Sequence, residues 1–420
     1  MRNKRQANYS YKFRLYPTKE QEQFLKRVIG SVRFVYNYML ARAKEEYRLV
    51  GKRWNVYEYK KLLPLLKEEH PFLKEVPSQS LQEAVFNLDR AFKNFFAGRS
   101  EFPSFKKKKH GGSFYLPQGW RIERVNQKWG LLYLPKLKEP VRVRLHRDIE
   151  GEIVSINVRL TPGGSFYLTV RVYKEIQKLK PVDRICAIDV GLKHFATICY
   201  LDGNVEKVEN PKYLVKTEKR LAREQRKLSR KQKGSKNYEK QRLKVAKLHE
   251  KVKNQREDFL HKLSKRIVSE NQAIVLEDLN VKGLLSGDLS KHIQDSSWRK
   301  FLQYLYYKAV WYGRDLIFAD RFYPSSKTCH VCGYKNQSLR LIDREWVCPV
   351  CGSKHDRDIN ASKNLLLYGV AHLTSGRVGT TQAKACGDGS ASGTALLPVY
   401  EASIVEAGSS CRKAGSPSIN

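Results

Sequence analysis

The feature that most constrains how this chain can fold is a set of four cysteines near residue 340. Their spacing is C-x2-C-x15-C-x2-C, formed by Cys329, Cys332, Cys348 and Cys351. This spacing is typical of a structural zinc site, since each pair places two thiolates on one turn. Four thiolates leave no open position on a tetrahedral ion. We therefore expect one structural Zn²⁺ that holds a small fold together and carries out no reaction.

Two disulfides are the alternative use of these cysteines. The chain has eight cysteines in 420 residues, which is too few for a disulfide framework. Cys186 and Cys199 lie in apolar, strand-like runs, and Cys386 and Cys411 lie in a weakly patterned tail. This distribution fits a reducing compartment, so we expect a cytoplasmic protein.

The charge of the chain predicts a polyanionic partner. Lys and Arg number 80 against 42 Asp and Glu, a formal net charge of +38. A compact protein with this charge repels itself unless a polyanion compensates, and nucleic acid is the simplest such partner. A cationic surface kept for solubility is a weaker explanation, because acidic residues serve solubility better. An anionic membrane is the other polyanion, but no apolar run of about 18 residues is present, so we expect no membrane partner.

The N-terminal half alternates between strand-like and helical patterns. Residues 8–16 read as a strand, and Thr18 with Gln21 forms a plausible capping box at the start of a helix that continues to about residue 49. Further helices are expected at 57–69 and 80–96, with Ser78 or Ser80 as N-cap and Phe86, Phe92, Phe95 and Phe96 in the helix core. Short strands follow at 113–116, 130–134, 141–145, 153–160 and 165–172. This order suggests a small β-barrel that the helices interrupt.

A second unit begins at residue 184 with a nearly continuous apolar strand. Strands at 195–200 and 205–208 follow, and then a long basic helical stretch at 212–271 that Gly234-Ser235 breaks into two arms. A solvated coiled-coil hairpin would explain this stretch, but its positive excess favours a hairpin that faces nucleic acid. The remaining expected elements are strands at 273–278 and 316–319 and helices at 297–312 and 361–368.

Three acids stand where these elements begin or end. Asp189 ends one apolar strand, Glu277 ends another, and Asp358 begins a helix. Each acid alone would be explained as a helix cap or a surface charge, but acids that end two apolar strands are an expensive arrangement without a ligand. Three hard oxygen ligands suit Mg²⁺ or Mn²⁺. Asp278 points to the opposite strand face from Glu277, and Asp356 either caps the helix or supports the site.

Several segments closely resemble the TnpB (OrfB) family of transposon-encoded, RNA-guided nucleases. They are Ile188 to Gly191, Leu276 to Asn280, Arg321 to Cys329, Cys348 to Gly352 with Asp356 to Asn364, Leu88 to Phe96, and Pro103 to Lys106. The resemblance covers residues 9–368 and leaves the tail uncovered. Its most specific feature is the zinc ribbon inserted just before the last acid. It also favours Glu277 over Asp278.

The resemblance implies a multidomain α/β fold with an added β-barrel. A RuvC-like nuclease domain with an RNase H fold would carry the inserted zinc ribbon, and a helical recognition domain would interrupt an N-terminal wedge-type β-barrel. The expected parts are wedge 1–16, recognition 17–101, wedge 102–180, nuclease 181–324 with the basic hairpin at 212–271, zinc ribbon 325–354, last nuclease helix 355–373, and a disordered tail 374–420.

The resemblance also implies an activity, partners and a prokaryotic source, with action at the nucleoid. Asp189, Glu277 and Asp358 would bind Mg²⁺ or Mn²⁺ and cut target DNA, guided by an RNA from the transposon end. A separate transposase would act on the same element. Ser78, Gln79 and Gln82 could read base edges, although a helix cap explains Ser78 equally well. Lys106, Lys107, Lys108 and Lys109 are expected to contact phosphates.

The rival hypotheses are a transposase or recombination accessory protein that acts without RNA, a catalytically idle RNA-guided DNA binder, and a plain nucleic-acid-binding structural protein.

Overall fold

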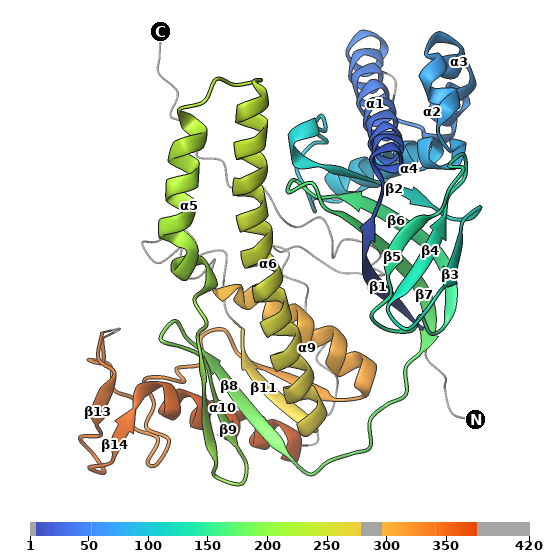
Figure 1. Ribbon diagram of the computed structural model, residues 1–420. Coiled ribbons are helices and arrows are strands. Elements are labelled where there is room, and N and C mark those ends of the chain that lie inside the picture. The colour runs from blue at the N-terminus through green and yellow to red at the C-terminus, as the bar shows by residue number, and fades with distance from the viewer. Residues whose placement is uncertain (1–5, 52, 279–295, 341, 376–420) are drawn as a thin grey trace. The chain divides into compact units, whose positions relative to one another are not determined.

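The computed structural model describes residues 6–51, 53–278, 296–340 and 342–375 (Figure 1). Apart from its first two residues, the tail that we expected to be disordered, 374–420, lies outside the described residues. The described residues form two main sheets of seven and five strands and a small pair of strands.

A seven-stranded antiparallel sheet dominates the N-terminal half. Its strands are β1 (Gln6–Tyr16), β2 (Gly112–Leu116), β3 (Arg121–Arg124), β4 (Trp129–Tyr133), β5 (Val141–Arg144), β6 (Glu152–Leu160) and β7 (Phe166–Glu175). The order is β2-β6-β7-β1-β5-β4-β3, so the first strand of the chain lies between β7 and β5. The sheet is a half-barrel whose edge strands are β2 and β3, which confirms the expected barrel only in part.

Helices interrupt this sheet after β1, as expected. They are α1 (Lys19–Val50), α2 (Val56–Lys61), α3 (Leu63–Glu69), η1 (Pro71–Glu75) and α4 (Ser78–Phe96), and the short η2 (Lys108–His110) precedes β2. The capping box at the start of α1 is confirmed. The Gln21 backbone N–H donates to Thr18 Oγ1, and the Gln21 side chain accepts from the Thr18 N–H at 3.0 Å.

Two expectations for α4 are wrong. Pro77 occupies the N-cap position, and neither serine caps the helix, because their hydroxyls have other partners. Ser78 Oγ accepts from Lys67 Nζ at 2.9 Å, and Ser80 Oγ donates to Tyr115 O at 3.1 Å. The phenylalanines also do not form one core, since Phe92 is buried whereas Phe96 is 75% exposed.

The C-terminal half contains a mixed five-stranded sheet. Its strands are β8 (Ile185–Val190), β9 (His194–Tyr200), β10 (Val205–Glu209), β11 (Ala273–Glu277) and β12 (Asp315–Ala319). The order is β10-β9-β8-β11-β12, with β8, β11 and β12 parallel and β9 and β10 antiparallel. The remaining elements are α5 (Tyr213–Ser229), α6 (Lys236–Glu270), α9 (Trp298–Tyr312), β13 (Glu345–Val347), β14 (Lys354–Asp356) and α10 (Arg357–Thr374).

Helices cover both faces of this sheet (Figure 1), which explains why its central strands are apolar up to Asp189 and Glu277. Side chains alternate between the faces along each strand. Ile188 and Leu276 belong to the core that α6 and α9 complete on one face. Ala187 and Val275 belong to the core that Leu365 of α10 completes on the other face.

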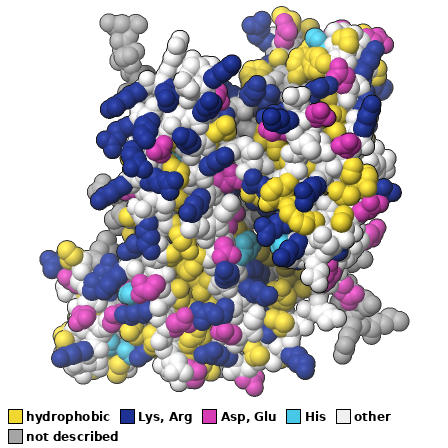
Figure 2. All heavy atoms as spheres, viewed as in Figure 1, with side chains coloured by type: hydrophobic (Ala, Val, Ile, Leu, Met, Phe, Trp, Pro, Cys, Tyr) yellow, Lys and Arg dark blue, Asp and Glu magenta, His cyan; other side chains and the backbone are white. Residues whose placement is uncertain are grey.

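The basic stretch forms a helical hairpin, with its break at the predicted place. Ser235 caps α6 by accepting from the Tyr238 N–H at 3.0 Å. The two arms meet at a short apolar cluster of Leu221, Val245 and Leu248. Figure 2 shows Lys and Arg side chains gathered over α5 and the neighbouring part of α6. The hairpin therefore presents an outer surface rich in cations. Among the described helices, none is long and apolar enough to cross a membrane.

Close packing of α10 on β11 predicts that Gly369 cannot carry a side chain. A Cβ at this position would overlap Val275 Cγ2 and would lie 3.2 and 3.3 Å from Val275 Cγ1 and Cβ, so rotation of the valine gives no relief. We expect Gly369→Ala to lower the free energy of unfolding by about 1–3 kcal/mol, measured by urea denaturation, although alanine is the better helix former. Adding Val275→Ala should recover part of this loss, and a Gly369→Ala protein as stable as the parent would contradict the packing.

Candidate functional site

Two of the three predicted acids end neighbouring parallel strands. Ile188 of β8 lies opposite Leu276 of β11, and the next residues are Asp189 and Glu277. Since side chains alternate, both acids belong to the face that carries Ala187 and Val275, which is the face that α10 covers. The register of one strand pair thus directs both carboxylates toward α10.

The third acid comes from the start of α10. Asp356 is the N-cap, and its Oδ1 accepts from the backbone N–H groups of Asp358 and Ile359, each at 3.0 Å. Asp356 Oδ2 accepts from Lys207 Nζ at 2.7 Å. Burial disfavours the Asp356 carboxylate, but these donors outweigh it and lower its pKa. Asp356 therefore fixes the first turn of the helix, and Asp358 lies in that turn.

The charges of Glu277 and Asp358 act on Asp189. Burial raises the pKa of Asp189 well above its ordinary value, and the neighbouring charges of Glu277 and Asp358 raise it further. Burial also raises the pKa of Glu277, with a contribution from Asp278. Arg344 Nη1 lies 3.5 Å from Asp358 Oδ1 and so supplies a cation at this place. A cluster of partly buried carboxylates of this kind is suited to binding a divalent cation.

Asp278 has a different environment from its neighbour Glu277. Its Oδ2 accepts from Arg321 Nη2 at 3.2 Å, in an ion pair that is partly open to solvent. Arg321 therefore compensates the charge of Asp278, and no metal ion is needed to explain an acid at this position.

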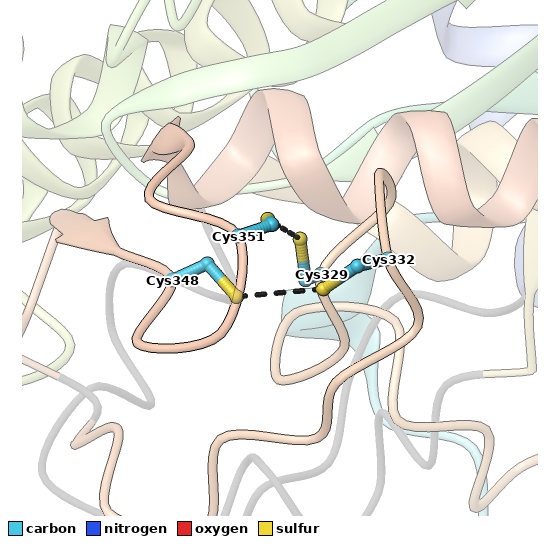
Figure 3. A group of neighbouring side chains, drawn as sticks. All are labelled: Cys329, Cys332, Cys348 and Cys351. Atoms are coloured by element: carbon cyan, nitrogen blue, oxygen red, sulfur yellow. Dashed lines mark hydrogen bonds between the residues drawn. The ribbon is translucent and has the colours of Figure 1, made fainter.

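The four cysteines gather at one point, as their spacing predicts (Figure 3). Cys329 Sγ lies 3.6 Å from Cys351 Sγ, and Cys332 Sγ lies 3.6 Å from Cys348 Sγ. Ligand sulfurs of a tetrahedral zinc thiolate are about 3.8 Å apart, as follows from a Zn–S bond of about 2.3 Å. Hydrogen bonding with Ser353 lowers the pKa of the Cys351 thiol to about 6, whereas desolvation and the other three thiols raise the pKa of the Cys332 thiol to about 12. The cysteines fit a metal ion, consistent with a zinc ribbon.

This cysteine group is more compact than the acids. Among the residues that the structure describes, it alone has three or more metal-ligating side chains whose ligand atoms all lie within 4.8 Å of one another. The ligand oxygens of Asp189, Glu277 and Asp358 are therefore spread more widely than the sulfurs.

Sequence reasoning missed several polar residues around the cysteines. His355 Nε2 lies 3.1 Å from Cys329 Sγ, and His355 is 4% exposed. Asn360 and Asn364 of α10 are buried and bond to the loop that carries Cys329. No spacing rule points to these residues. The signal that could have found the two asparagines is their four-residue spacing, which places both amides on one side of the helix.

The candidate nucleic-acid residues lie at the surface. Ser78 is exposed, and Gln79 and Gln82 are half-buried on α4. The lysines at 106–109 are all exposed, and the backbone of Lys106 is held by the Asn37 amide through hydrogen bonds of 2.8 and 3.0 Å. The basic segment is thus anchored through its backbone while its side chains remain accessible.

Three family models match successive parts of the chain. Residues 7–52 match a helix-turn-helix domain of OrfB proteins, residues 167–287 match a family described as a probable transposase (OrfB, IS605), and residues 298–365 match the Cas12f1-like TNB domain. The last match contains all four cysteines and Asp358.

A protein of Streptomyces pristinaespiralis, named "Putative RNA-guided DNA endonuclease", is 39% identical over 91% of this chain and 92% of its own length. A protein of Escherichia coli K12 with the same name and the designation InsQ is 32% identical, covering 88% of this chain and 94% of its own. A Cas12f1 protein, solved in complex with guide RNA and target DNA, has a similar fold, with a TM-score of 0.56 and 15% identity over 83% of each chain. The chain therefore belongs to the TnpB (OrfB) family of transposon-encoded RNA-guided nucleases.

Proposed function

We propose that the protein is an RNA-guided, Mg²⁺-dependent DNA endonuclease that hydrolyses phosphodiester bonds at Asp189, Glu277 and Asp358. The observation that carries this proposal is the convergence of three acids from β8, β11 and α10 on one face of a sheet. In this sheet β10, β9 and β8 pair in antiparallel fashion, and β11 and β12 are added parallel to β8. This strand order supports a RuvC-like domain with an RNase H fold. The names of the two relatives support the same activity.

The three carboxylates would hold Mg²⁺ or Mn²⁺, since hard oxygen ligands suit these ions. Bound ions would supply Lewis acidity and a metal-activated water for hydrolysis. The contribution of the protein is to place the acids. The paired strands orient Asp189 and Glu277, and the Asp356 cap sets the first turn that carries Asp358. Arg344, at 3.5 Å from Asp358, is a cation that a DNA phosphate could contact.

We assign the other parts according to their surfaces. The half-barrel and its helices would form the wedge and recognition parts, with Ser78, Gln79 and Gln82 as readers of the short DNA motif beside the target. The exposed lysines at 106–109 and the cationic hairpin would contact phosphates of the guide RNA and target DNA. Base pairing by the RNA would supply the sequence specificity.

We assign one structural Zn²⁺ to Cys329, Cys332, Cys348 and Cys351. Sulfur–sulfur distances of 3.6 Å and a closed set of four thiols support zinc and leave no position for a substrate. The zinc ribbon would therefore position neighbouring elements, and the acids would carry out the reaction.

RNA dependence is the direct test of the proposed function. Protein purified with its co-expressed RNA should cut a matching DNA duplex in the presence of Mg²⁺ and should lose cleavage after RNase treatment or addition of EDTA. Cleavage that survives RNase treatment would instead support a transposase or recombinase that needs no RNA. Sequencing of the co-purified RNA identifies the guide.

The acid site predicts a sharp difference between two aspartates. Asp189→Asn keeps the shape of the side chain but removes a ligand charge. We expect DNA cleavage to fall by more than about 100-fold, because even residues that only support a metal ligand contribute 10–100-fold. The matched control is Asp278→Asn, which breaks the Arg321 ion pair but keeps all three proposed ligands and should still cut. RNA binding, measured by filter retention, should be unchanged in both, and equal cleavage by the two variants would refute the assignment.

The cysteine site predicts a loss of metal without a loss of the whole fold. Cys348→Ser should release one zinc ion per chain, measured by elemental analysis, and should increase proteolysis around residues 325–355. Cys186→Ala is the matched control, because Cys186 is a buried cysteine in β8, outside this group. Its zinc content should equal that of the parent. The same zinc content in Cys348→Ser would argue against this ligand.

A further inference from the structure

Two asparagines on the inner face of α10 are more deeply buried than polar residues usually are. Asn360 is 1% exposed and Asn364 is 2% exposed. They are four residues apart and therefore lie on the same side of the helix. A buried amide is unfavourable unless its donors and acceptor are paired, so the partners of these two side chains indicate what the pair does.

Both side chains donate to a single carbonyl oxygen beside the first metal ligand. Thr328 O accepts from Asn360 Nδ2 at 2.7 Å and from Asn364 Nδ2 at 2.6 Å. Asn364 Nδ2 also donates to Ser325 O at 2.8 Å. Because Thr328 directly precedes Cys329, these bonds hold the backbone that presents the Cys329 sulfur.

Asn360 also binds the residue that follows Cys329. Its Oδ1 accepts from the His330 backbone N–H at 3.1 Å and lies 2.9 Å from His330 Nδ1. Lys363 Nζ lies 3.3 Å from His330 Nε2, and an ammonium group can only donate. His330 Nε2 is therefore the acceptor, so Nδ1 carries the proton and donates to Asn360. Every polar group of the Asn360 side chain thus faces the cysteine loop, which fixes the orientation of its amide.

We propose that Asn360 and Asn364, here called the asparagine clamp, are positioning residues that couple metal binding by the four cysteines to the placement of Asp358. The clamp holds the backbone on both sides of Cys329, and Asp358 lies only two residues before Asn360 on the same helix. Without a metal ion to join the cysteines, the loop would be less constrained and the clamp would lose its fixed partners. The start of α10, with Asp358, would then lose one of its supports.

This coupling acts in both directions. If metal binding stabilises the clamp, the clamp must strengthen metal binding by the same factor. Zinc affinity is therefore a readout that does not depend on cleavage. The role given to Asp358 rests on the proposed function, whereas the link between the clamp and the cysteine site does not.

The test measures Zn²⁺ affinity of full-length protein by competition with a chromophoric chelator. We expect Asn360→Asp and Asn364→Ala each to weaken zinc binding by about 10–100-fold, as for other residues that support a metal ligand. Asn360→Asp keeps the side-chain volume but faces Thr328 O with a second oxygen, so a cavity cannot explain its effect. The matched control is Asn336→Ala, an asparagine of the same ribbon that bonds to Ser338 and should bind zinc normally. Unchanged zinc affinity in both clamp variants would overturn the proposal.

A second measurement needs no variant and so does not depend on their folding. Hydrogen exchange of backbone amides at 357–364 should become faster when zinc is removed from the unmodified protein, while amides of α9 stay protected. Equal protection with and without zinc would also overturn the proposal. Asp189→Asn separates the two hypotheses. If it still cuts DNA, the acid site is wrong, but its zinc affinity should be normal in either case.

Discussion

The parallel pairing of β8 with β11 is the interaction on which the rest of the site depends. Because Ile188 lies opposite Leu276, the two strands end level with each other and turn Asp189 and Glu277 to the same face. A shift of one residue would turn one acid toward the apolar core formed with α6 and α9. The pairing is enforced by burial, since these strands are apolar up to their last residues and helices cover both faces.

Helix α10 connects the zinc ribbon and Asp358 to the paired strands. Leu365 and Gly369 fit against the sheet so closely that a single added methyl group would clash with Val275. Asn360 and Asn364 bond to the cysteine loop, and Asp356 starts the helix. One helix of 18 residues thus has an apolar contact with the sheet, a polar contact with the ribbon and an acid at its first turn. This combination explains how a ribbon inserted between β12 and α10 can be compatible with acids from β8, β11 and α10 on one face of the sheet.

Part of this arrangement could be predicted from the sequence because it leaves local signals. The spacing of the cysteines indicates a metal site, and Asp189 and Glu277 can be recognised as acids at the ends of apolar strands. The strand register and the face toward which each acid points depend on pairing between distant segments, which no local pattern encodes. Ser78 had the residue type of an N-cap, but Lys67 from another helix binds its hydroxyl. Asn360 and Asn364 were missed because their partners, the carbonyl oxygens of Ser325 and Thr328, lie far away in the sequence.

The charge of the helical hairpin affects the stability of the protein before it binds RNA. Its arms are joined by three buried aliphatic side chains and by Gln241, which donates to Glu224 of the opposite arm. Many cations surround this narrow contact, and their mutual repulsion opposes closure of the arms. If the hairpin contacts nucleic acid as proposed, that contact would offset the repulsion and stabilise the closed hairpin. Newly made protein without RNA would be the form most open to proteases, so its lifetime in the cell would follow the supply of its guide.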